Sequence, residues 1–142
     1  MIDFHVTRTS SATAEAVFDR LTDHASYQDM TPLRTSVLER PGDTDHNGVG
    51  ARRRIGIVGP TQVEEVTEFV RPSRFAYRLV SGLPVRDHVG TVELASVPEG
   101  TRIDYRVQSK PIVPGSGLIL GPILKKAIGG LLDGVIARAE SR

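Results

Sequence analysis

The central part of the chain, from Gly48 to Tyr105, is a series of short segments in which apolar and polar residues alternate. An alternation with a period of two is typical of strands that bury one face. Turn-forming residues separate the segments, and such short connections join antiparallel neighbours. We therefore expect an antiparallel meander, preceded by one N-terminal strand, with strands over 2–9, 33–40, 49–58, 62–71, 75–81, 86–97 and 101–109.

Helical patterns flank this set of strands. After Ser10 and Ser11, whose hydroxyls could cap a helix, four apolar residues recur at helical spacing: Ala14, Val17, Phe18 and Leu21. A second short helix is expected over 23–30, ending before Pro32. A long helix is expected from about residue 117 to the end. The sequence thus predicts an α+β fold: a curved antiparallel sheet of about seven strands around a long C-terminal helix, with two short helices after the first strand.

The C-terminal helix combines an apolar stripe with an unusual number of glycines. The stripe consists of Leu124, Ile128, Leu131, Leu132 and Val135, and the glycines are Gly117, Gly121, Gly129, Gly130 and Gly134. Each glycine inside a helix costs about 1 kcal/mol relative to alanine. Small residues leave room, which serves either a cavity or close backbone packing. Pro122 either starts the regular helix or kinks one that began earlier.

Length and composition limit the possible functions. The 142 residues suit one domain over 1–142, and a net charge of +1 gives no general attraction to nucleic acid. Absence of cysteine excludes disulfides and thiolate sites and suits a cytoplasmic protein. The N-terminal residues form a strand pattern without the features of a signal peptide. The apolar stretch 112–124 is too short to span a bilayer, so no integral membrane segment is expected.

Four sequence stretches resemble one known superfamily. They are SATAEAVFDRLTD (Ser11–Asp23), GVGARR (Gly48–Arg53), VTEFVRPSRFAY (Val66–Tyr77) and GTRIDY (Gly100–Tyr105). In this order and spacing they resemble the START-like, SRPBCC superfamily, and within it the polyketide cyclase/dehydrase and lipid-transport group. The resemblance covers nearly the whole chain and implies the helix-grip fold, also called START/Bet v 1-like.

The resemblance leaves the function open, because the superfamily includes ligand carriers, cyclases and aromatases. The chain also departs from the pattern at one point. Many relatives carry a tryptophan near the second short helix, whereas this chain has no tryptophan and offers Tyr27 there instead.

Strand alternation places Arg53 on the same face as Ala51 and Ile55, so its charge is a candidate for burial and would then need a partner. Either Glu64 or Glu65 of the next strand could supply it, depending on the register. The alternative is that the arginines of this strand are solvated and bury only their stems.

Three further strands have predicted inward sets. These sets are Phe75, Tyr77 and Leu79; Arg86, His88, Val92 and Leu94; and Ile103, Tyr105 and Val107. If these faces are concave, they place polar groups in an apolar chamber, which is the usual form of a small-molecule site. His88 is the candidate catalytic acid or base. The predicted lining of the chamber is Arg53, Tyr77, His88, Leu94, Tyr105, Ile128 and Leu131. The alternative is that the tyrosines are core residues and His88 is half-exposed.

Other motifs are absent or incomplete. Residues 43–48 begin like a calcium loop, but Arg54 stands where a bidentate glutamate is needed. The four histidines lack metal-ligand spacing, so no metal is expected. The stretch from Gly48 to Arg53 ends in arginine where a dinucleotide-binding motif needs glycine, and it precedes a strand. We therefore expect no cofactor.

Three functions are compatible with these features. The leading hypothesis is binding of a hydrophobic small molecule, a lipid or polyketide-like compound, between the sheet and the C-terminal helix. The first alternative is a cyclase or dehydratase in which His88, Arg53 and the tyrosines orient a substrate and move protons. The second alternative is an interaction module, monomeric or homodimeric, that uses an apolar surface at Leu118, Ile119 and Leu120.

Overall fold

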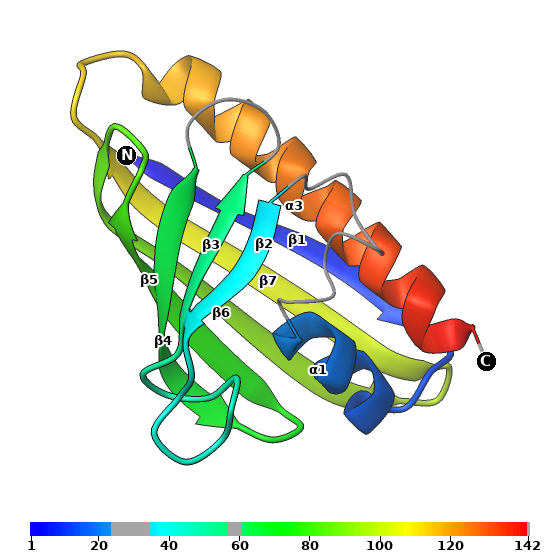
Figure 1. Cartoon of the computed structure of the whole chain (residues 1–142). Coiled ribbons are helices and arrows are strands. Elements are labelled where there is room, and N and C mark those ends of the chain that lie inside the picture. Colours follow the sequence, from blue (N-terminus) through cyan, green and yellow to red (C-terminus); the bar gives the residue numbers. More distant parts are fainter. Residues whose placement is uncertain (24–34, 57–60, 142) are drawn as a thin grey trace.

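A single seven-stranded antiparallel sheet forms the body of the molecule (Figure 1). The computed structural model describes residues 1–23, 35–56 and 61–141. The strand order is β1-β7-β6-β5-β4-β3-β2, so only β1 lies away from its neighbour in sequence. The elements are β1 (Ile2–Ser10), α1 (Ala14–Thr22), β2 (Thr35–Arg40), β3 (Arg52–Gly56), β4 (Gln62–Val70), β5 (Arg74–Ser81), β6 (Val85–Val97), β7 (Gly100–Pro111) and α3 (Gly117–Glu140).

The predicted α+β architecture is confirmed, with shifts at some boundaries. β3 begins at Arg52 instead of Val49 because Gly48–Ala51 forms a turn in which Gly50 has a φ of 90°. This positive φ favours glycine. The second short helix, predicted over 23–30, lies almost wholly outside the described residues, as does Tyr27.

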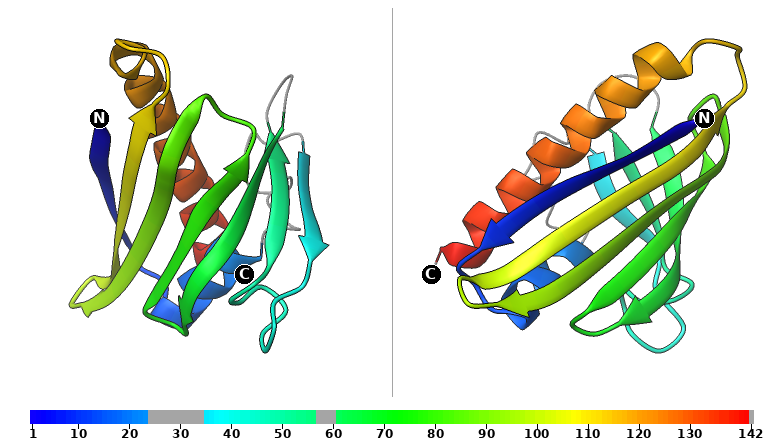
Figure 2. Two further views of the ribbon diagram at one scale, coloured as in Figure 1. Left: turned by 90° about the vertical axis from the view of Figure 1, so that its left-hand side faces the viewer. Right: turned by 180° about the vertical axis from the view of Figure 1, so that it is seen from behind.

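The helix α3 runs along the sheet on the side of β1 and β7 and also contacts α1 (Figure 2). It begins at Gly117, so Pro122 lies inside a helix that started earlier. A Cβ atom on Gly117 or Gly121 would lie 3.6 or 3.9 Å from the Ile2 side chain, and one on Gly129 would lie 3.1 Å from Arg8. These three glycines therefore lie on the face of α3 that approaches β1.

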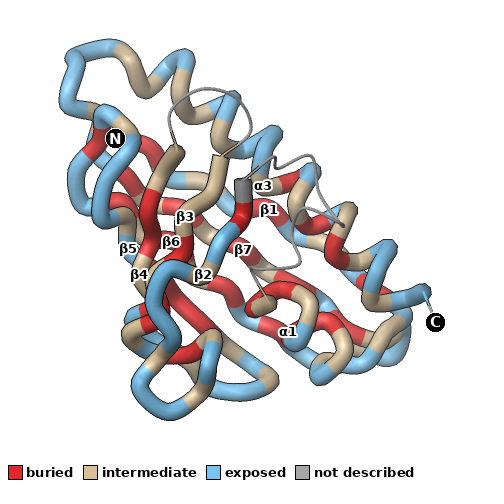
Figure 3. The backbone as a smooth tube through the Cα atoms, viewed as in Figure 1, coloured by how far each residue is buried: buried red, intermediate tan, exposed pale blue. Residues whose placement is uncertain are grey.

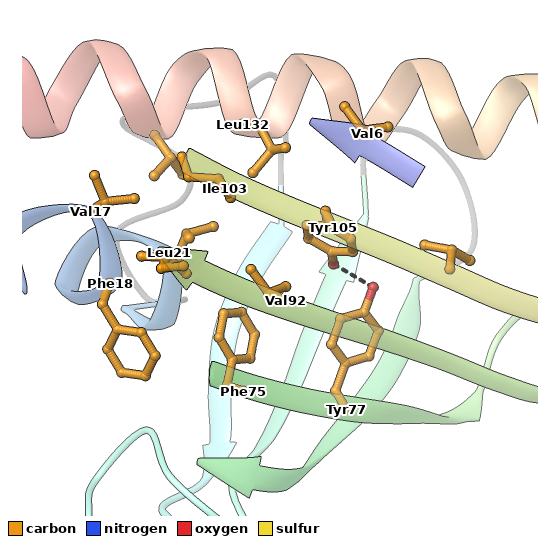
Figure 4. Packing of buried hydrophobic residues seen from close by; sticks show 13 residues of the cluster. Val6, Val17, Phe18, Leu21, Phe75, Tyr77, Val92, Ile103, Tyr105 and Leu132 are labelled. Carbon is orange, nitrogen blue, oxygen red and sulfur yellow. Dashed lines mark hydrogen bonds between the residues drawn. The ribbon is translucent and has the colours of Figure 1, made fainter. Parts of the chain in front are cut away.

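The hydrophobic core lies where α1 and the second half of α3 cover the sheet (Figure 4). Phe18 of α1 makes edge-to-face contacts with Phe69 and Phe75, with ring centroids 5.1 and 5.9 Å apart. Leu132 and Val135 of α3 close the core from the other side. Burial of these faces is the main source of stability for both helices.

The N-terminus of α1 is capped differently from the sequence prediction. Thr13, not Ser10 or Ser11, is the N-cap, and its hydroxyl accepts a hydrogen bond from the Ala16 amide at 3.2 Å. The Ser10 hydroxyl instead donates to the Glu140 carboxylate at 2.8 Å, and the Ser11 amide donates to the same oxygen at 2.9 Å. These bonds tie the end of α3 to the junction between β1 and α1.

Among the helices that the structure describes, none combines the length and the apolar character needed to cross a membrane.

Candidate functional site

A buried ion pair lies on the inner face of β3 and β4. Arg53 is opposite Glu64 in the antiparallel register, and both side chains are 3% exposed. The Glu64 carboxylate accepts hydrogen bonds from Arg53 Nη2 at 2.8 Å and from Arg53 Nε at 3.2 Å. Its second oxygen accepts a bond from Gln62 Nε2 at 2.9 Å. Charge-assisted bonds of this kind compensate the cost of removing both ions from water.

This register decides between the two candidate partners of Arg53. Glu64 points inward, whereas Glu65 points to the outer face, where it binds Arg40, Arg52 and Arg78. The hydrogen bond from Arg52, followed by those from Arg78, holds the pKa of Glu65 below its ordinary value against the opposing effect of burial.

Two tyrosines continue the polar cluster toward the centre of the sheet. The hydroxyls of Tyr77 in β5 and Tyr105 in β7 are hydrogen-bonded at 2.5 Å, as Figure 4 shows. The Arg53 guanidinium lies over the Tyr77 ring, 4.7 Å from its centroid. Burial, and secondarily the proximity of Tyr77 and Glu64, raises the pKa of Tyr105 well above its ordinary value. Tyr105 therefore remains a neutral hydroxyl that can donate or accept a hydrogen bond.

Gly90 of β6 makes space for the Tyr77 side chain. It lies opposite Tyr77 in the register, and a Cβ atom at this position would overlap the Tyr77 ring and hydroxyl. The absence of a side chain at Gly90 thus allows the Tyr77 ring to lie directly over the backbone of β6.

His88 is buried on β6, the strand between those that carry Tyr77 and Tyr105. Its Nδ1 lies 3.0 Å from the Ser109 hydroxyl of β7, and its ring centroid is 6.4 Å from that of Tyr77. Burial lowers the pKa of His88, and the Glu64 charge opposes this effect only partly. The imidazole is consequently neutral near pH 7, which suits a hydrogen-bonding partner or a base.

An irregularity in β6 corrects one predicted inward set. The register shifts between Arg86 and Val89, and Asp87 has a φ of 52°. This bulge adds one residue to the strand. As a result Val85 and His88 are buried, while Arg86, predicted to share the face of His88, is exposed.

The structure brings together four of the seven predicted lining residues: Arg53, Tyr77, His88 and Tyr105. Leu94 of β6 lies opposite Ile103 of β7 and belongs to the same buried cluster as Tyr77 and Tyr105. Ile128 and Leu131 of α3 are partly buried against the same core. The two tyrosines therefore belong both to the polar cluster and to the apolar core that contains the other predicted lining residues.

Three members of the cluster were not identified from the sequence. Ser109 follows Tyr105 and Val107 at the next inward position of β7, and Gln62 precedes Glu64 at the next inward position of β4. Continuing the alternation by one step would have found both. Gly90 has the correct parity too, but without a side chain it gave no polar signal.

The cluster can bind a polar group by hydrogen bonds and can exchange a proton at His88. It combines one ion pair, two phenols, an amide, a hydroxyl and a neutral imidazole beside the apolar core. Among the residues that the structure describes, no group of histidine, aspartate and glutamate side chains could hold a metal ion.

A curved antiparallel sheet around a long C-terminal helix defines the helix-grip class of proteins. The chain belongs to the polyketide cyclase/dehydrase and lipid transport family, whose sequence profile matches residues 1–141. No protein with a curated function matches the sequence.

Solved structures support the same fold. XoxI from Bacillus cereus has a TM-score of 0.79 at 16% identity, with 99% of this chain and 97% of that chain covered. Ara h 8.0201 has a TM-score of 0.74 at 13% identity, with coverage of 99% and 98%. The di-domain ARO/CYC protein StfQ of the steffimycin biosynthetic pathway has a TM-score of 0.79 at 17% identity. The match covers 99% of this chain and 51% of StfQ.

Proposed function

We propose that the protein binds a hydrophobic small molecule between the inner face of the sheet and α3, with the polar end of that molecule at the cluster around Tyr77 and Tyr105. The observation that carries this proposal is the convergence of buried polar side chains from five adjacent strands, β3 to β7, on one apolar face. Small-molecule sites typically combine an apolar lining with a few such groups. Membership of a family that includes lipid transport supports the same function.

The charges in the cluster favour a ligand with a neutral polar end. The positive charge of Arg53 is already matched by Glu64 at 2.8 Å, so a ligand carboxylate would add an uncompensated negative charge. A hydroxyl or carbonyl group can instead bond to the phenols and the imidazole. We therefore expect alcohols, phenols or ketones with an apolar body to bind more tightly than fatty acids of the same length.

Native mass spectrometry of freshly purified protein is the first test. We expect an adduct that solvent extraction releases as an apolar compound. If the sample is empty, the probe is the neutral dye N-phenyl-1-naphthylamine, whose fluorescence reports an apolar site, with long-chain alcohols and the matching fatty acids as competitors. Absence of any adduct, together with probe fluorescence no higher than that of an unrelated folded protein, would rule out the proposal.

A pair of α3 variants locates the site. Ile128→Trp places an indole ring on the side of the helix that packs against the core, whereas Ala127→Trp places the same ring on its exposed side. We expect at least tenfold weaker probe binding for the first variant and no change for the second. Equal effects of the two variants would place the ligand elsewhere.

His88 supports a second candidate function, proton transfer in a cyclisation or dehydration. A neutral, buried imidazole close to two phenols can take a proton from carbon next to a carbonyl group while the phenols bind the oxygen. The test is turnover of a poly-β-ketone analogue by wild type and His88→Gln. A loss of at least a hundredfold would support catalysis, and unchanged turnover would remove His88 from any catalytic role.

A further inference from the structure

One end of the molecule exposes a group of large apolar side chains. This apolar tip comprises the loop before α3, the first turns of α3 and the start of the chain. Leu118 is 85% exposed and Ile119 70% exposed. The tip residues are Met1, Ile112, Val113, Leu118, Ile119 and Ile123. Contiguous exposed apolar surface of this kind is uncommon on monomeric proteins and marks interaction sites.

The geometry of α3 explains why these side chains face water. Gly117 and Gly121 occupy the face of the helix that approaches Ile2 of β1. The large residues beside them therefore point away from the sheet and contribute little to the core. Figure 1 shows this part of α3 and its preceding loop projecting at one end of the molecule, and Figure 3 shows the exposed stretches along it.

Positive charge borders the apolar tip. Lys125 and Lys126 follow it by half a turn and are exposed, and neither forms an ion pair with any residue that the structure describes. Both lysines line an open groove of about 750 Å³ between α3 and β1, which also contains Arg8 and His5. The groove includes one carboxylate, that of Asp133, which is paired with Arg8 at 2.9 Å.

The sequence around Lys125 and Lys126 supplies no acidic residue that would neutralise their charge. No aspartate or glutamate occurs between Tyr105 and Leu132, a stretch that contains Arg106, Lys110 and the two lysines. Arg106 pairs with Asp3, and Lys110 lies 3.4 Å from Asp87, so Lys125 and Lys126 carry the unbalanced charge.

We propose that the apolar tip docks on an anionic phospholipid bilayer, inserting Leu118, Ile119 and Ile123 into the interface while Lys125 and Lys126 contact the headgroups. Apolar residues next to lysines on a surface helix are the features that bind a membrane interface without spanning it. Each lysine near an anionic surface strengthens binding. A second copy of the chain fits less well, because the tip projects and because pairing two tips would bring four unbalanced lysines together.

Sedimentation with vesicles tests the proposal. One set contains phosphatidylcholine with about one third phosphatidylserine, and the other contains phosphatidylcholine alone. We expect binding to the anionic set, weaker binding at higher salt because the charges are screened, and little binding to the neutral set. No binding to the anionic vesicles, or equal binding to both sets, would overturn the proposal.

Matched variants then locate the contact. Leu118→Ser with Ile119→Ser should weaken binding at least tenfold, because the inserted apolar area is lost. Val37→Ser with Val70→Ser removes apolar groups that are 50% and 54% exposed elsewhere and should change nothing. Lys126→Glu should weaken binding about fivefold or more. Arg102→Glu on β7 makes the same change in net charge away from the tip and should leave vesicle binding unchanged. Equal losses from tip and control variants would contradict the assignment.

Light scattering tests the alternative that a second copy of the chain, and not a bilayer, covers the tip. A dimer in solution that becomes a monomer on Leu118→Ser with Ile119→Ser would assign the tip to self-association and overturn the bilayer proposal. A monomer in both cases, with vesicle binding lost only in the tip variant, would support it.

Discussion

Glu64 and Glu65 are neighbours in β4, and they bind arginine in opposite ways. Glu65 lies on the outer face, is 15% exposed, and contacts Arg40, Arg52 and Arg78. Glu64 lies on the inner face, is 3% exposed, and contacts Arg53 and Gln62. One strand thus carries a surface ion-pair network and a buried ion pair side by side, because alternate residues face opposite sides of the sheet.

The two sites differ in the free energy needed to remove their charges from water. Ion pairs near water are inexpensive to form, and each contributes about 0–1 kcal/mol. A buried pair must first lose its hydration, so an apolar pair of similar size often stabilises a fold equally well or better. Stability alone therefore explains the outer network more readily than the inner pair. The inner pair lies next to Tyr77 and Tyr105, which is consistent with a role in ligand binding.

Removing the buried carboxylate should have the largest effect. Glu64→Ala leaves the Arg53 guanidinium in the interior without its carboxylate, and such a change typically costs about 3–5 kcal/mol. We expect this loss in the free energy of unfolding measured by urea denaturation at pH 7. On the outer face, Glu65→Ala serves as the control and should cost about 1 kcal/mol, with the cost decreasing at high salt.

A double variant separates stability from function at the same site. Arg53→Met with Glu64→Met replaces both ions by apolar side chains and should recover most of the stability lost in Glu64→Ala. Its probe binding should still fall, because the polar cluster is incomplete. If the double variant is as unstable as the single one, the ion pair is structural and the contrast between the two faces of β4 fails.

Gly90→Ala should have the next largest effect. The added methyl group would overlap the Tyr77 ring, so the ring or the strand must shift, at a cost of about 1–3 kcal/mol. Gly130→Ala is a matched control, because a Cβ atom there meets nothing within 4 Å. In the helix it should stabilise the protein by about 0.5–1 kcal/mol. Urea denaturation of both variants measures the difference, and equal signs would contradict the placement of Tyr77 over Gly90.

The inner face could be predicted largely from alternation alone. Arg53, Tyr77, His88 and Tyr105 were all assigned to it because regular strands reverse their side chains at each residue. Two kinds of information were missing. The choice between Glu64 and Glu65 depends on how β3 and β4 align, and this alignment is set by pairing across the sheet. The exposure of Arg86 depends on a bulge at Asp87, where φ is 52°, and the alternation of apolar and polar residues does not reveal this bulge.

The glycines of α3 show a different limit of prediction. Their pattern was compatible with a cavity or with close packing, and the choice depends on which element the helix meets. Gly117, Gly121 and Gly129 face β1, and this leaves Leu118 and Ile119 on the outside. A sequence gives the composition of a helix face, but the neighbour of that face is a property of the assembled fold.

Titration of His88 should give the smallest effect, because no contact is removed. Burial keeps the pKa of His88 in the folded protein below its ordinary value of about 6.5. The unfolded chain therefore binds a proton near pH 6.5 while the folded protein does not, so the free energy of unfolding decreases as the pH falls from 8 to 5. In His88→Gln this contribution is absent, and the difference in stability between wild type and variant should shrink on acidification.

Ser109→Ala removes the hydrogen-bond partner of His88 but not its burial. It should therefore lower stability by about 1 kcal/mol at every pH and leave the pH dependence intact. If Ser109→Ala abolishes the pH dependence, the hydrogen bond, and not burial in the inner face, keeps His88 neutral.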